Sequence, residues 1–159
     1  MGADLYLNSV FQKNRDKYEP KFDHWVAKRN ALRKAGQLEA ADRAQKWVSK
    51  YYGKMYERGY FRDSYNSSNL LWLFDLSWWR DVLEVLVGKD GKMSPRNAKR
   101  FLQMLADGEP VFEANLKKVK PAKGETRAEV EKYFRDKYER LKAFLRQAID
   151  RKESVQCSL

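Results

Sequence analysis

The chain has 159 residues, 43% of them apolar, so a single domain with a sizeable core can form without disulfides or metals. Its 33 Lys and Arg residues outnumber 22 Asp and Glu residues; the net charge of +11 excludes an acidic mimic of DNA and favours anionic partners. The one cysteine, Cys157, has no partner for an internal disulfide, and no run of about 18 apolar residues is present. We therefore expect a soluble, cytoplasmic protein that does not associate with membranes.

The N-terminal third predicts a short extended segment followed by a helical hairpin. Residues 3–7 are expected to be extended, and a capping box at Ser9 begins a helix that Pro20 breaks or restarts. Apolar residues then recur every three or four positions until Gly36, a helix stop signal. Leu38 opens a longer helix with the same spacing, which predicts an antiparallel partner for the first.

The middle of the chain predicts loops and short helices. Gly59 ends the second long helix, and the polar sequence of residues 61–69 predicts a loop. A short helix is expected over 70–74, with Ser67 or Ser68 as its cap. Ser77 predicts the start of another helix, which ends at Gly88.

The C-terminal part predicts two further helices. An Asp-Gly turn at residues 89–92 is followed by Ser94 and Pro95, the preferred cap and first-turn residues of a helix. Residues 107–124 contain two prolines and two glycines and are expected to form an irregular connection. A capping box then opens the longest helix, over 126–151, and residues 153–159 are expected to be a flexible tail.

Together these elements predict a mainly α fold. We expect one compact helical domain over residues 1–159, with a long helical hairpin, short central helices, a long C-terminal helix and a short extended N-terminal segment.

Aromatic residues crowd into one central segment. Residues 51–82 contain ten of the 22 aromatic side chains, which predicts that the core is built there. Arginines and polar residues alternate with these rings, so a binding site can share the segment.

The sequence GYFRDSYNSSN within that segment is the strongest candidate for a binding site. The guanidinium of Arg62 suits phosphate or carboxylate, and Tyr60 and Tyr65 offer ring faces on which a base can stack. The alternative is purely structural: Arg62 and Asp63 pair with partners inside the fold. The candidate ligand-binding residues are Arg58, Tyr60, Arg62, Tyr65, Asn66 and Arg80.

The sequence contains little of the chemistry that enzymes use. His24 is the only histidine, no phosphate-binding glycine loop is present, and Cys and His are too few for a zinc site. The only remaining catalytic route is a pair of carboxylates near the aromatic segment, chosen from Asp63, Asp75, Asp81 and Glu84. The spacing of these residues is ordinary for the protein surface and is not typical of a catalytic pair. We therefore expect no catalytic residues, no metal, no cofactor and no enzymatic activity.

The predicted C-terminal helix is rich in basic residues. Glu131 and Arg135, like Asp136 and Arg140, are four residues apart, which is typical of a helix stabilised by ion pairs in water. This pattern favours a solvated helix face over a nucleic-acid interface.

With MGADLYLNSV at its start and MYERGYFRDSYNSSNLLWLFDLSWWRD in its middle, the chain resembles a group of small, uncharacterised proteins encoded by bacteriophages and prophages. The resemblance covers residues 1–100 and includes GKMSP. It implies a small protein that counters host defence, by blocking a host protein or by sequestering a signalling nucleotide, and a location in the host cytoplasm. It implies no catalytic residues.

Three functions follow as expectations. The first is non-enzymatic binding of a phosphate-bearing signalling nucleotide. The second is inhibition of a host protein through exposed Trp and Tyr side chains. The third is weak, non-specific nucleic-acid binding through the basic surface. A homo-oligomer is compatible with each of them.

Overall fold

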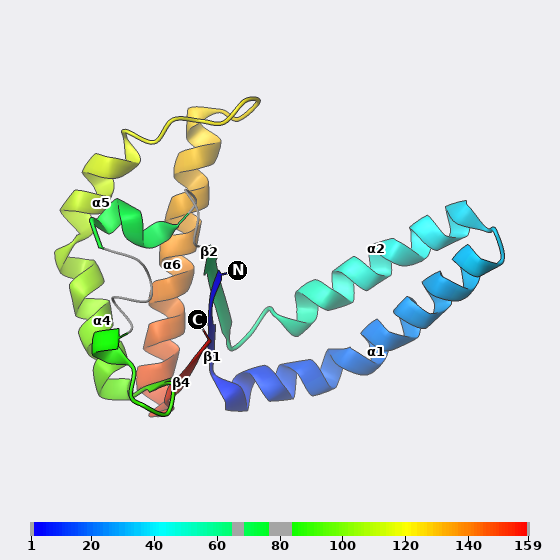
Figure 1. Cartoon of the computed structure of the whole chain (residues 1–159), viewed down its shortest axis with the longest axis horizontal. Coiled ribbons are helices and arrows are strands. Elements are labelled where there is room, and N and C mark those ends of the chain that lie inside the picture. Colours follow the sequence, from blue (N-terminus) through cyan, green and yellow to red (C-terminus); the bar gives the residue numbers. More distant parts are fainter. Residues whose placement is uncertain (1, 65–68, 77–83, 159) are drawn as a thin grey trace. The chain divides into compact units, whose positions relative to one another are not determined.

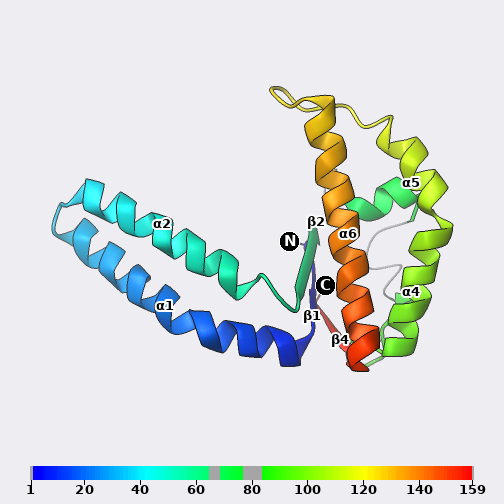
Figure 2. The same cartoon turned by 180° about the vertical axis from the view of Figure 1, so that it is seen from behind.

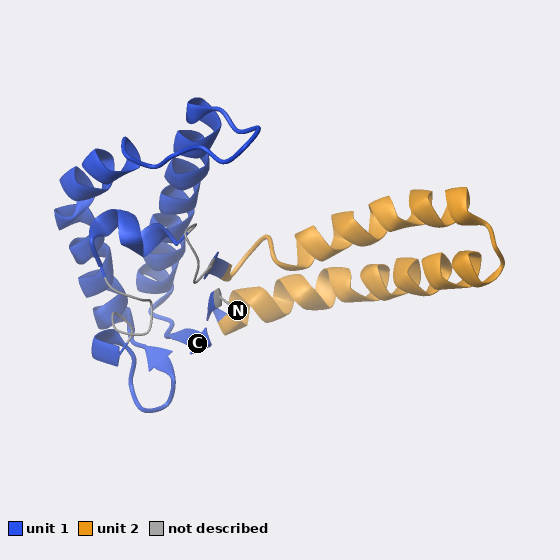
Figure 3. Cartoon of the chain, turned by 45° about the horizontal axis from the view of Figure 1, so that its top comes forward, with its two compact units in different colours: residues 1–7, 61–159 blue, residues 8–60 orange. Residues whose placement is uncertain are grey.

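The computed structural model describes residues 2–64, 69–76 and 84–158 (Figure 1). The chain divides into two compact units: residues 1–7 with 61–159, and residues 8–60 (Figure 3). The expectation of a single domain stays a prediction. The predicted caps Ser67, Ser68 and Ser77 lie outside the described residues.

The unit of residues 8–60 is the predicted helical hairpin. Helix α1 spans Asn8–Lys34 and helix α2 spans Leu38–Met55. Between them Gly36 has φ +72°, a left-handed conformation that favours glycine and confirms the predicted turn.

The predicted break at Pro20 is wrong, because α1 continues through this residue. Proline removes one helical hydrogen bond and crowds the preceding turn, which bends a helix or breaks it. Ring contacts with α2 hold α1 on both sides of the proline: Tyr18 with Tyr51 at 6.4 Å and Phe22 with Tyr52 at 6.0 Å. Tertiary packing therefore outweighs the local signal, and α1 bends along its length (Figure 2).

The other unit contains a four-stranded sheet in the order β2-β1-β4-β3. The strands are β1 (Gly2–Tyr6), β2 (Tyr60–Ser64), β3 (Lys92–Met93) and β4 (Val155–Ser158). Strand β4 runs antiparallel to both β1 and β3, with Leu5 opposite Cys157 and Met93 opposite Val155. The predicted extended N-terminal segment is thus strand β1.

Two segments predicted to be irregular are strands. The loop expected from residue 61 begins with β2, and the flexible tail expected over 153–159 contains β4. Val155 and Cys157 are buried, as are Phe61 and Asp63, so alternate residues of both strands face the core. The pairing that orders them is with distant strands, which no local pattern reveals.

The helices of this unit confirm most sequence predictions. Those with described bounds are η1 (Leu70–Phe74, a 3₁₀ helix), α4 (Pro95–Asp107), α5 (Glu109–Leu116) and α6 (Arg127–Arg151). Ser94 caps α4, and Thr126 forms the predicted capping box with Glu129 at the start of α6. The side-chain oxygen of Asn69 caps η1 by accepting the N–H of Leu71. The mainly α fold is therefore confirmed.

The connection predicted as irregular over 107–124 contains α5, whose first turn holds Pro110. In the first turn of a helix the backbone N–H groups have no partner within the helix, so the missing N–H of proline costs nothing there. Pro110 therefore starts the helix and does not break it. Phe112 and Leu116 of α5 are buried.

Helix α6 lies between the strands on one side and α4 and α5 on the other (Figures 1 and 2). On the α5 side, the rings of Phe74, Phe112 and Tyr138 lie about 5 Å from one another between centroids. On the sheet side, Phe144 contacts Phe61 at 6.4 Å. Helix α6 is therefore the central element of this unit's core.

The described rings of the central aromatic segment are divided between core and surface. Of its described rings, Phe61 and Phe74 are buried, whereas Tyr52 and Trp72 are exposed. The remaining large buried rings of this unit lie on α4, α5 and α6.

Within the described residues, no helix combines the length and apolar character that crossing a membrane requires.

Candidate functional site

A buried ion pair joins β2 to α6. The ammonium of Lys137 donates a 2.8 Å hydrogen bond to Oδ1 of Asp63, and both side chains are almost entirely buried. The second carboxylate oxygen of Asp63 accepts the backbone N–H of Leu70 at 2.8 Å. Each charge is therefore compensated inside the protein, as buried charges must be. The structural reading of Asp63 is confirmed.

Beside this pair lies a hollow of about 550 Å³, which we call the Arg62–Arg140 hollow. Its lining residues come from β2 and α6: Arg62, Asp63, Tyr133, Asp136, Lys137 and Arg140. The four α6 residues are spaced i, i+3, i+4 and i+7, which places them along one face of the helix.

Most of the charged side chains that line the Arg62–Arg140 hollow are paired, and basic side chains outnumber acidic ones. Asp63 and Lys137 neutralise each other, and Asp136 pairs with Lys132 on the helix surface. Arg62 lies 3.6 Å from Oδ1 of Asp4 on the neighbouring strand.

Arg140 is exposed and forms no ion pair with any residue that the structure describes. Arg140 therefore gives the hollow its excess positive charge, and Arg62 contributes a second guanidinium that is paired with Asp4.

Tyr133 supplies an aromatic ring to the same hollow. Its side chain is 49% exposed, and its ring meets that of Phe134 edge to face at 5.1 Å. The Lys137 ammonium lies 4.5 Å from the centroid of the Tyr133 ring. A half-exposed ring held by neighbours on one helix can stack on a planar ligand at little cost in conformational entropy.

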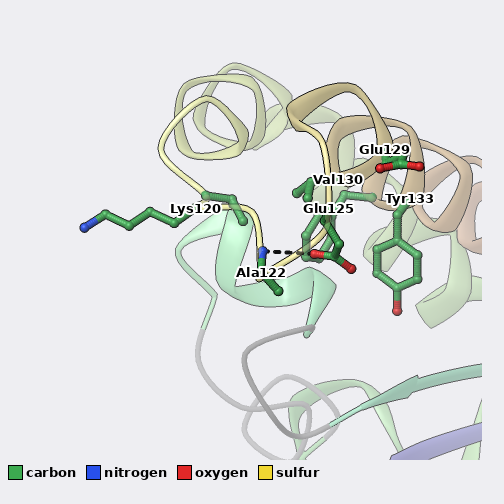
Figure 4. A pocket seen from close by; sticks show the side chains of 8 residues that line it. Lys120, Ala122, Glu125, Glu129, Val130 and Tyr133 are labelled. Atoms are coloured by element: carbon green, nitrogen blue, oxygen red, sulfur yellow. Dashed lines mark hydrogen bonds between the residues drawn. The ribbon is translucent and has the colours of Figure 1, made fainter.

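Tyr133 also lines a second hollow of about 440 Å³, between α6 and the chain that precedes it (Figure 4). Here the Glu125 carboxylate accepts the N–H of Ala122 at 3.1 Å, while Lys120 points away. Glu129 is held by the N–H and hydroxyl of Thr126, and these hydrogen bonds lower its pKa. The carboxylates of Glu125 and Glu129 make this second hollow unsuited to anions.

The structure describes three of the six predicted site residues: Arg58, Tyr60 and Arg62. Arg62 lines the Arg62–Arg140 hollow, whereas Arg58 lines a different hollow of about 340 Å³ in the hairpin unit. The Tyr60 ring contacts Tyr56 at 4.9 Å and Phe11 at 6.0 Å. The other three, Tyr65, Asn66 and Arg80, lie outside the described residues.

Sequence reasoning missed Tyr133, Lys137 and Arg140 as possible site residues. Their signal was present as regular spacing on one face of a predicted helix, but the surrounding carboxylates indicated a solvated surface. Only the packing of α6 against β2 shows that this face borders a hollow.

The described carboxylates that sequence analysis considered for catalysis do not form a pair with one another. Asp63 is bound to Lys137, and Asp75 accepts a 2.9 Å hydrogen bond from Asn115. Glu84 is exposed, and Asp81 lies outside the described residues. Within the described part of the chain, no three His, Cys, Asp or Glu side chains gather where they could hold a metal ion.

Comparison of the chain with protein-family models, with curated proteins and with solved structures finds no match in any of the three.

Proposed function

We propose that the protein is a non-enzymatic binding protein for a phosphate-bearing nucleotide, which it holds in the Arg62–Arg140 hollow. The observation that carries the proposal is the placement of Arg62, Arg140 and the Tyr133 ring around one concavity. A volume of about 550 Å³ falls within the range of small-molecule sites.

The two arginines would bind the phosphate. A guanidinium donates paired hydrogen bonds that match the geometry of phosphate oxygens. Arg62 is exposed and lies 3.6 Å from the partly buried Asp4 carboxylate. A guanidinium has five N–H donors, so Arg62 can donate to a phosphate in addition to this contact. The buried Asp63–Lys137 pair fixes the local register of β2 and α6 and so holds the two arginines in place.

The Tyr133 ring would stack on the base. Stacking on an aromatic side chain contributes about 1–3 kcal/mol per base and tolerates different bases. This combination of ring and guanidinium binds a nucleotide without a glycine-rich phosphate loop.

Binding without turnover is what sequestration of a signalling nucleotide requires. The expectation of a phage-type protein that counters host defence in this way stays a prediction. The protein-inhibitor alternative also stays a prediction, and exposed aromatic side chains such as Trp72 are the anchors it would use.

Isothermal titration calorimetry with a panel of cyclic and ADP-ribose-derived nucleotides tests the proposal. We expect at least one to bind at micromolar concentration and to be recovered unchanged. Arg62→Ala and Arg140→Ala should each weaken binding about 10- to 100-fold, because a charged hydrogen bond contributes about 1.5–3 kcal/mol. Tyr133→Ala should weaken it by about 1–3 kcal/mol if the ring stacks on the base.

Matched controls separate binding from folding. Arg146 is an exposed arginine of the same helix that does not line the hollow, so Arg146→Ala should bind as the wild type does. Thermal melts of every variant identify those that merely lose stability. Failure of every nucleotide to bind, or equal loss in Arg146→Ala, would refute the proposal.

A further inference from the structure

One side of the α1–α2 hairpin carries a continuous row of aromatic rings. Trp25 stacks on Trp47 with centroids 5.4 Å apart, Trp47 stacks on Tyr51 at 6.1 Å, and Tyr51 contacts Tyr18 at 6.4 Å. Trp47 remains 40% exposed. The row therefore links α1 to α2 and still presents ring surface to solvent.

Four lysines accompany this row, each with its ammonium over a ring. Lys17 lies 5.2 Å from the Tyr18 centroid and Lys21 lies 5.9 Å from that of Tyr51. Lys28 lies 4.8 Å from Trp25 and Lys50 lies 4.4 Å from Trp47. We call the four rings and four lysines the lysine–aromatic face: Lys17, Tyr18, Lys21, Trp25, Lys28, Trp47, Lys50 and Tyr51.

None of these four lysines forms an ion pair with any residue in the described ranges. Their ammonium groups rest on rings, a contact worth only about 0.5–1 kcal/mol at exposed sites. An anion can therefore draw them away at small cost.

The opposite side of the hairpin differs in this respect. Tyr51 and Tyr52 are adjacent on α2 and point about 100° apart, on either side of the buried Val48 and Met55. Tyr52 belongs to a second row, with Phe22 at 6.0 Å and Tyr56 at 4.9 Å, and no described lysine lies over these rings. Packing between α1 and α2 explains why each side of the hairpin has a row of rings. It does not explain why lysines lie over the rings of only one of the two rows.

The positive charge continues from this face into a neighbouring hollow and dominates the whole hairpin. The hollow of about 340 Å³ shares Lys17 and Tyr18 with the face and adds Lys13, Lys54 and Arg58, with Glu57 paired to Lys54. Residues 8–60 contain 13 Lys and Arg against 6 Asp and Glu, so this unit holds +7 of the chain's net +11. From Lys13 to Lys28 the basic residues extend about 22 Å along α1, at 1.5 Å per residue.

We propose that the lysine–aromatic face binds single-stranded nucleic acid. The phosphates of the strand would attract the lysine ammonium groups away from the rings. Bases would then stack on the ring faces that become free, above all on the exposed ring of Trp47. With Lys13 of the neighbouring hollow included, the length of about 22 Å accommodates roughly six stacked nucleotides at about 3.4 Å each. A duplex would use only the charge, since its bases are already stacked, and an acidic protein partner would leave the rings without a specific role.

Fluorescence anisotropy of the whole protein with a labelled deoxythymidine oligonucleotide of about 20 nucleotides tests the proposal. We expect binding at about 50 mM salt that is at least tenfold stronger than to a duplex of equal length. Changing Lys17, Lys21, Lys28 and Lys50 together to Gln should weaken binding at least tenfold. It should also lower the slope of log K against log salt by about 3, because each phosphate contact contributes about 0.7 for a single strand.

A control variant removes the same charge elsewhere. Lys89, Lys99, Lys120 and Lys123 are exposed lysines of the other unit. Changing these four to Gln should leave the salt slope nearly unchanged. Equal loss in both variants would overturn the proposal, because net charge alone would then explain binding. Should the first variant unfold in a thermal melt, the pairs K17Q/K21Q and K28Q/K50Q should each give about half of its loss in slope.

Tryptophan fluorescence tests the role of the rings. The oligonucleotide should quench the wild-type emission, and Trp47→Phe should remove much of that quenching. Trp72→Phe is the matched control, because Trp72 is 39% exposed in the other unit. Quenching that survives in Trp47→Phe, tight duplex binding equal to that of the single strand, or no binding of the oligonucleotide would each refute single-strand recognition by this face.

Discussion

The ion pair between Asp63 and Lys137 connects the stability of the fold to the candidate site. Transfer of two charges from water into a protein interior costs several kcal/mol each, and their attraction offsets this only with good geometry and satisfied hydrogen bonds. The 2.8 Å contacts of the Asp63 carboxylate with Lys137 and with the N–H of Leu70 meet that condition. The pair therefore specifies how β2 meets α6, and removal of one partner leaves the other uncompensated.

Lys137→Met should destabilise the protein by about 3–5 kcal/mol, because it leaves a buried carboxylate without a counter-ion. The double variant Asp63→Asn/Lys137→Met should regain most of this loss, since Asn still accepts the Leu70 N–H. Urea unfolding followed by circular dichroism measures both. Lys132→Met, which breaks the exposed pair with Asp136, should barely move the midpoint. A Lys137→Met variant as stable as Lys132→Met would contradict this account.

Two buried acids predict how stability depends on alkaline pH. Burial raises the pKa of the Cys157 thiol from 9.0 to about 12, and burial with the nearby Glu109 carboxylate raises that of Tyr138 from 10.0 to about 12. Above about pH 9 the unfolded chain loses these protons while the folded protein keeps them, so the folded state binds more protons. The free energy of unfolding should therefore be insensitive to these groups at neutral pH and fall between about pH 9 and 12.

Urea titrations at a series of pH values test this prediction. Tyr138→Phe and Cys157→Ala should each reduce the steepness of the alkaline decline, even where the substitution lowers stability at neutral pH. The same decline in both variants as in the wild type would show that other groups are responsible.

At the scale of elements, Pro20 shows tertiary packing overriding a local signal. A proline inside a helix costs about 3 kcal/mol relative to alanine. Pro20→Ala restores an N–H that can donate to the carbonyl of Asp16, so we expect the hairpin to become more stable by up to about 3 kcal/mol. The thermal unfolding midpoint of Pro20→Ala is compared with that of Asp23→Ala, a change at an exposed position of the same helix. A less stable Pro20→Ala variant would mean that the bend in α1 is needed for its contacts with α2.

Sequence reasoning located the elements whose ends carry local signals. At Thr126 and at Ser94 a side-chain oxygen accepts a backbone N–H and so fixes the start of a helix, and at Gly36 a left-handed φ fixes the turn. Strands β2 and β4 were missed because distant strands complete their hydrogen bonds.

The candidate site was predicted only in part for the same reason. Arg62 was identified by its chemistry, but Tyr133 and Arg140 are more than 70 residues further along the chain and join it only through packing. The lysine–aromatic face was not identified at all, because its rings come from both helices and become one row only when α1 and α2 pair.

At the scale of the whole molecule, the two units differ in charge and in the binding chemistry that they present. The hairpin unit holds +7 of the chain's net charge of +11. The other unit holds the remaining +4, and the Arg62–Arg140 hollow belongs to it. A small nucleotide and a nucleic-acid strand are therefore expected to bind at different places on this chain.

Photo-crosslinking with an azido-substituted nucleotide, followed by peptide mass spectrometry, tests the central claim most directly. The probe is the azido form of whichever nucleotide binds most tightly by calorimetry. We predict that label is found on α6 in the peptide that contains Tyr133, and that Arg62→Ala/Arg140→Ala removes it while Arg146→Ala does not. Label confined to residues 8–60, or label at Tyr133 that persists in the double variant, would contradict the assignment of nucleotide binding to the Arg62–Arg140 hollow.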